Sequence, residues 1–98
     1  MSSRIEKQGE GKFLISGLLE FATATQLARQ GNELFKIEGD ALVLDLGGVT
    51  RSDSAGLALL IEWRRVAEQR KQTLSFSNIP QQLLDIAEVS GIDKLISA

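Results

Sequence analysis

A run of polar residues, Arg51-Ser52-Asp53-Ser54, stands directly before a long apolar stretch, with Ala55 and Gly56 at the junction. Serine and aspartate are common at helix N-termini, because their oxygens accept hydrogen bonds from the free amides of the first turn. A polar cluster beside apolar residues can also be a site that a partner protein contacts. The pattern is therefore either an ordinary helix start or a docking site.

The apolar stretch that follows predicts a helix over residues 54–70. At about 100° per residue, its core face gathers five apolar residues: Leu59, Leu60, Trp63, Val66 and Ala67. The side that carries Ser54 holds a second group: Leu57, Ala58, Ile61, Arg64, Arg65 and Glu68. An apolar strip rimmed by arginines is typical of a protein-docking surface. A helix start that is buried all round would instead place Leu57 and Ile61 in the core, and the spacing fits both alternatives.

Other chemistry finds little support. Asp45 and Asp53 could form a carboxylate pair, but no nucleophile stands with a base beside them. The absence of cysteine and histidine removes thiol, imidazole and soft-ligand zinc chemistry. A net charge of −2 and an aromatic content of 5% argue against nucleic-acid binding. We therefore expect no enzymatic activity, no metal, no cofactor and no nucleic-acid partner.

The pattern of the chain predicts a β-β-α-β-α-β-α order within one domain, residues 1–98, of the α/β class. The continuous apolar run 41–46 indicates a central strand buried on both faces, and Gly47-Gly48 is expected to end it. The other expected strands are 4–7, 12–16 and 73–77, and the other helices are 21–35 and 81–89, with a short element over 92–98. No apolar leader or membrane span is apparent, so we expect a cytoplasmic protein that does not insert into a membrane.

The segments LVLDLGGVTRSDSAGLALL and ISGLLEFATATQL resemble the hallmark motifs of STAS domains, the fold shared by bacterial anti-sigma factor antagonists and the tails of sulfate transporters. The resemblance implies a STAS fold with roughly a four-stranded mixed sheet covered by about three to four helices. In this pattern Asp45, Asp53 and Gly56 support the site. In the antagonist branch, a partner anti-sigma factor kinase phosphorylates the serine that corresponds to Ser54, and the residue corresponding to Leu57 contacts the partner. Antagonists usually carry an aspartate where this chain has Glu20.

A second branch resembles the chain in more detail. The segments TRSDSAGLALLIEWRRVA and LLDIAEVSGIDKLI are similar to the small STAS subunit of the Mla phospholipid-transport ABC system of Gram-negative bacteria. This resemblance implies a non-enzymatic subunit at the inner membrane that binds the transporter's ATPase subunit and supports outer-membrane lipid asymmetry. The expected partner-binding residues are Ser54, Leu57, Ala58, Ile61 and Arg65. The alternative is an anti-sigma factor antagonist that phosphorylation of Ser54 switches.

Overall fold

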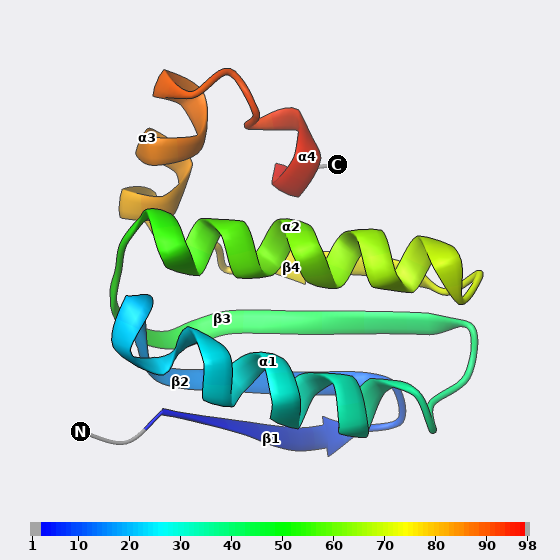
Figure 1. Cartoon of the computed structure of the whole chain (residues 1–98). Helices are drawn as coiled ribbons and strands as arrows, with labels where there is room; N and C mark the ends of the chain where they lie inside the picture. The colour runs from blue at the N-terminus through cyan, green and yellow to red at the C-terminus, as the bar shows by residue number, and fades with distance from the viewer. Residues whose placement is uncertain (1–2, 98) are drawn as a thin grey trace.

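A computed structural model describes residues 3–97, over which four strands and four helices follow one another (Figure 1). The strands are β1 (Arg4–Gly9), β2 (Lys12–Leu19), β3 (Ala41–Ser52) and β4 (Thr73–Ser77). The helices are α1 (Phe21–Phe35), α2 (Ser54–Gln69), α3 (Gln81–Val89) and α4 (Lys94–Ser97). The expected element order is therefore confirmed, while Ala98 at the end of the last expected element lies outside the described residues.

The strands form one mixed sheet in the order β1-β2-β3-β4. β1 and β2 pair antiparallel as a hairpin, whereas β2 pairs parallel with β3 and β3 pairs parallel with β4. The two parallel connections run through α1 and α2, which lie across the same face of the sheet (Figure 1). α3 and α4 pack beside α2. This α/β architecture confirms the fold class that the sequence predicts.

Burial along β3 alternates, because the helices cover only one face of the sheet. Leu42, Leu44 and Leu46 are buried, while Val43 and Asp45 between them are half-buried. The expectation that both faces of this strand are buried is therefore wrong. An apolar residue such as Val43 is also found on a partly exposed sheet face. An unbroken apolar run therefore does not distinguish a strand buried on both faces from one buried on a single face.

The centre of the core is built around Trp63, whose exposed fraction is 2%. Its ring meets that of Phe35 edge to face, with 5.4 Å between the ring centroids, and Phe35 meets Phe13 in the same way at 5.1 Å. Gly31 lies against the Trp63 ring so closely that a Cβ atom there would overlap it. A glycine inside α1 therefore permits the close packing of α1 against α2.

β3 does not end at Gly47-Gly48, as the sequence suggested, but continues to Ser52. A Cβ at Gly48 would lie 2.6 Å from Ser16 Oγ and 2.8 Å from the Ile15 carbonyl oxygen of β2. The register between β2 and β3 shifts in this region. The glycine thus allows two irregular strands to approach closely, and the extended β3 delivers Asp53 to the end of the sheet.

Candidate functional site

Asp53 is the N-cap of α2, so the interpretation of an ordinary helix start in which the Ser54 hydroxyl is the cap is wrong. Its Oδ1 atom accepts hydrogen bonds from the backbone amides of Ala55 at 2.9 Å and Gly56 at 3.1 Å. Ser54 is consequently the first helical residue, and its side chain is exposed. Within residues 3–97 the Ser54 hydroxyl has no hydrogen bond that would tie it to the fold, so it is available for contacts outside the chain.

The second oxygen of Asp53 serves another helix. Oδ2 accepts a hydrogen bond of 3.2 Å from the amide of Phe21, the first residue of α1. Desolvation raises the pKa of Asp53, but the hydrogen bonds from Phe21, Gly56 and Ala55 together outweigh it and hold the pKa below its ordinary value. One ionised carboxylate therefore joins the N-termini of α1 and α2, where both helix dipoles favour negative charge.

Gly56 has a steric role beneath this junction. It is buried, and a Cβ atom at this position would overlap the carbonyl group of Leu19 at the end of β2. The Asp53 amide also donates to the Leu19 carbonyl oxygen at 3.3 Å. The first turn of α2 can therefore sit directly on the end of β2 only if residue 56 has no side chain.

The exposed arc of α2 includes most of the strip that the sequence predicts. Ala58 and Arg65 are exposed and Ile61 is half-buried, packed in part against the core. Arg65 forms an ion pair with Glu62, which raises the pKa of its guanidinium. The ion pair holds the cation in place along the edge of the exposed arc.

Leu57 does not belong to this arc. Its exposed fraction is 3%, and it is part of the hydrophobic core. The expectation that its side chain lies on the exposed strip is therefore wrong. Leu57 is only about 60° around the helix from Ser54. However, α2 contacts α1, α3, α4 and β4, and these neighbours bury most sides of α2, including the side that carries Leu57.

Phe21 adds an apolar side chain that the sequence analysis missed. It is 82% exposed and is joined to the start of α2 by its hydrogen bond to Asp53. The buried residues of α1 recur at Thr23, Leu27 and Gly31, a face from which Phe21 is displaced by helical geometry. A helical-wheel comparison could have found it. We call the set Phe21, Ser54, Ala58, Ile61 and Arg65 the Ser54 surface.

Two further contacts hold this surface in place. Arg51 Nε donates to Glu20 Oε2 at 2.7 Å, which joins the end of β3 to the N-cap of α1 and raises the pKa of Arg51. The buried Ser52 donates from its amide and hydroxyl to Gln82 Oε1, at 3.0 and 3.2 Å, which joins β3 to α3. The supports of the site thus come from β3, α1 and α3.

Asp45 is not part of this arrangement. Its Oδ1 atom accepts hydrogen bonds from Asn78 Nδ2 at 2.9 Å and the Gly47 amide at 2.8 Å, which lower its pKa. Asp45 lies seven residues before Ser52 in β3, a distance of about 23 Å at about 3.3 Å per residue. Asp45 and Asp53 therefore do not form a carboxylate pair, and residues 3–97 hold no cluster of three or more potential metal ligands. Asp45 orders the turn after β4 instead.

The whole described chain matches a known family. A family model described as "Mlab, STAS domain" matches residues 3–97. The chain belongs to this family of STAS domains. A comparison with curated protein sequences found no match. None of the helices in residues 3–97 has the length and apolar character needed to cross a membrane.

Solved structures share the STAS fold. The anti-sigma factor antagonist SpoIIAA in its unphosphorylated form has a TM-score of 0.72 and 15% identity, over 97% of this chain and 85% of that chain. A sulfate transporter family protein from Wolinella succinogenes has a TM-score of 0.70 and 18% identity, over 96% of this chain and 76% of that one. The murine Solute Carrier 26 family member A9 matches with a TM-score of 0.68 and 19% identity, over 90% of this chain but only 15% of the transporter. At these identities the matches establish the fold alone.

Proposed function

We propose that this STAS domain is a non-enzymatic subunit that docks on the ATPase subunit of an ABC-type phospholipid transporter, on the cytoplasmic side of the inner membrane. The observation that carries the proposal is the exposed Ser54 hydroxyl. Ser54 does not cap α2, because Asp53 is the N-cap. The family description and the sequence motifs supply the choice of transporter, whose task would be to maintain outer-membrane lipid asymmetry.

The composition of the Ser54 surface favours contact with a protein. Phe21 and Ala58 provide exposed apolar groups, Ile61 provides a partly exposed one, and Arg65 provides a charged edge. Protein interfaces commonly combine an apolar centre with a polar rim. The Asp53 and Arg51 contacts fix the two helix N-termini before binding, so little ordering would oppose association.

Titration calorimetry with the purified ATPase subunit tests the proposal. Ser54→Asp places a carboxylate at the first position of α2, where the helix dipole tolerates it, so the protein should fold normally. At a desolvated interface the same charge should lower the affinity by about tenfold or more unless a cation faces it. Thr73→Asp, an equally exposed change on β4, serves as the control and should bind like the original protein. Equal affinities for all three proteins, or no binding by the original protein, would refute the proposed docking.

The second candidate is an anti-sigma factor antagonist switched by phosphorylation of Ser54. The exposed hydroxyl at a helix N-terminus favours it, because the dipole there stabilises a phosphate group. SpoIIAA has also been solved in a phosphorylated form, which matches this chain with a TM-score of 0.69 and 15% identity. Intact-mass analysis of the protein from its native cells would show one added phosphoryl group, absent in Ser54→Ala. An unmodified protein that binds the ATPase subunit would exclude this candidate.

A further inference from the structure

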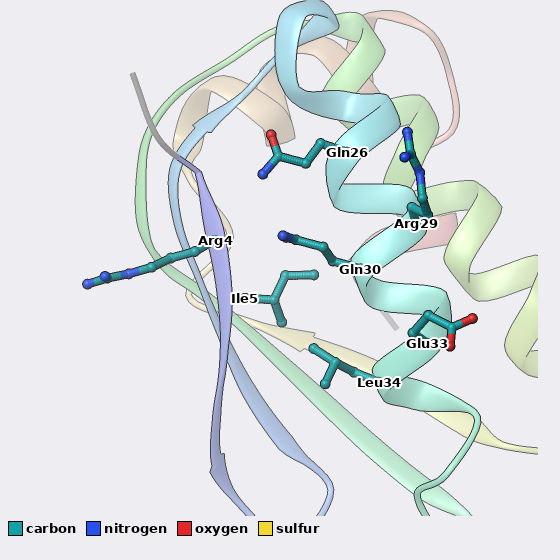
Figure 2. Close-up of a pocket in the computed structure, with 7 residues that line it drawn as sticks. All are labelled: Arg4, Ile5, Gln26, Arg29, Gln30, Glu33 and Leu34. Atoms are coloured by element: carbon teal, nitrogen blue, oxygen red, sulfur yellow. The ribbon is translucent and has the colours of Figure 1, made fainter.

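A groove of about 560 Å³ lies between β1 and α1, and none of its lining residues belongs to the Ser54 surface (Figure 2). Ile5 of β1 and Leu34 of α1 point toward each other across it, and Gln26 and Gln30 line the helix side. Ile5 and Leu34 are only partly buried against the core. Covering the groove would therefore remove further apolar surface from water, which favours association.

β1 is also an edge strand, since it pairs only with β2 in the described sheet. Its outer side presents backbone donors and acceptors that another strand can use. A register shift between Lys7 and Gly9 limits the regular part of the strand at one end. At the other end, the Ser3 hydroxyl donates to the Leu18 carbonyl at 2.6 Å and accepts from the Leu18 amide at 3.1 Å. The regular part of the edge is therefore 4–7, which includes Ile5.

We propose that a second copy of this chain occupies the edge, with β1 pairing antiparallel to β1 about a twofold axis at Ile5. Side chains that face each other across two strands must lie on the same face of the sheet. Ile5 points toward α1 and Arg4 points away from it (Figure 2). Glu6 lies two residues from Arg4 and shares its face, where the two side chains form an ion pair of 3.4 Å within one chain. Only a few registers satisfy this condition within so short an edge.

Charge selects one of these registers. An axis at Ile5 pairs Arg4 with Glu6 of the second copy twice and places the two Ile5 side chains together. Moving the axis to Arg4 or to Glu6 would instead oppose two arginines or two glutamates, which is unfavourable in directly opposed pairs. The rim of the groove also carries charges of both signs, since Arg29 and Glu33 both line it. The edge is thus complementary to itself, as a twofold interface requires.

In the paired form the two grooves join beneath the two α1 helices, and Ile5 and Leu34 of both copies form one apolar layer. The Ser54 surface uses other residues, since none of its members belongs to β1 or lines the groove. The pairing is therefore independent of the docking proposed above, and each can fail without the other.

Disulfide trapping tests the register, because the chain contains no cysteine. Arg4→Cys and Glu6→Cys, mixed in equal amounts, should form the mixed disulfide several-fold faster than either variant forms its own. Opposed Cα atoms in an antiparallel pair are about 4.5–5.5 Å apart, which suits a disulfide, whereas two residues 4 would be about 8 Å apart. Thr73→Cys on β4, the opposite edge, is the control and should crosslink slowly. Equal rates for the mixture and the single variants would overturn the register.

Sedimentation tests the association itself. Arg4→Glu and Glu6→Arg should each weaken the dimer by about tenfold or more, because each creates two like-charged pairs. The double variant Arg4→Glu/Glu6→Arg should restore it. An original protein that stays monomeric up to about 1 mM, or a dimer that is indifferent to these changes, would overturn the proposal. In the first case the edge would be left for a strand of a different protein.

Discussion

The two carboxylate oxygens of Asp53 accept hydrogen bonds from two different helices, and this arrangement leaves the Ser54 hydroxyl free to contact a partner. One oxygen caps α2 and the other binds the first amide of α1. Had Ser54 been the cap, its hydroxyl would have been committed to the helix, and any substitution would have mixed stability with binding. In this structure the fold depends on Asp53, while Ser54 can be changed almost independently.

Replacing Asp53 should therefore weaken the fold. We expect Asp53→Ala to lower the free energy of unfolding by about 1–2 kcal/mol, because it removes the N-cap and leaves the Phe21 amide without its acceptor. Asp53→Asn keeps an oxygen for α2 and should lose clearly less. Urea unfolding of the three proteins measures the difference. Equal stability of Asp53→Ala and the original protein would show that the junction contributes little.

Ala58 is the cleaner probe of the Ser54 surface. Ala58→Asp changes an exposed side chain, so the melting temperature should stay within a few degrees while affinity for the ATPase subunit falls about tenfold or more. Ile61→Asp should lose affinity as well, but it should also destabilise the fold by about 1–3 kcal/mol because Ile61 is half-buried against the core. Thermal melts and calorimetry on both variants separate the two effects. Unchanged binding by Ala58→Asp would remove this residue from the interface.

At the level of elements, apolar periodicity and the residues at helix ends and turns predicted much of the secondary structure. The helices over 21–35 and 81–89 and the strand over 73–77 agree with the structure. The extension of β3 through Gly47-Gly48 could not be predicted, because a glycine pair usually ends a strand and only the approach of β2 explains it here. The burial of Leu57 likewise depends on how the other elements pack around α2. Periodicity along one helix does not contain that information.

Gly31 offers a test of packing between elements. Gly31→Ala should raise the intrinsic helix propensity of α1, yet its Cβ would overlap the Trp63 ring. We expect the clash to dominate and to lower the stability by about 1–3 kcal/mol. Gly39→Ala is the matched control, since a Cβ there meets no atom within 4 Å. Chemical denaturation of both variants gives the comparison, and a Gly31→Ala protein more stable than the original would show that α1 and α2 can separate at little cost.

For the molecule as a whole, acidic side chains couple folding to pH. The pKa values of Asp45, Asp53, Glu38 and Glu62 are all lowered from their ordinary values of 3.8 for aspartate and 4.5 for glutamate. Hydrogen bonds dominate three of these shifts, from Asn78 to Asp45, from Lys7 to Glu38 and from Arg65 to Glu62. The folded state therefore binds protons less readily than the unfolded chain does.

Acid should accordingly destabilise the protein. Carboxylates with lowered pKa values contribute stability above their unfolded pKa, and this contribution is lost as the pH falls through the folded pKa. We expect the melting temperature to be nearly constant between about pH 5 and 7 and to fall steadily below about pH 4.5. In Asp45→Asn the fall should be shallower. Calorimetry across this range provides the measurement, and a melting temperature that rises on acidification would contradict these pKa shifts.

The position of the single tryptophan has a practical consequence for these measurements. Trp63 is enclosed between Phe35 and Gly31 in the centre of the core, and its indole Nε1 has no hydrogen-bond partner in the described residues. Its fluorescence should therefore be emitted at short wavelength in the folded protein and shift to longer wavelength on unfolding. Because the Ser54 surface and the β1 edge are formed by other side chains, binding at either should leave the emission spectrum nearly unchanged. One optical signal can thus report folding separately from association.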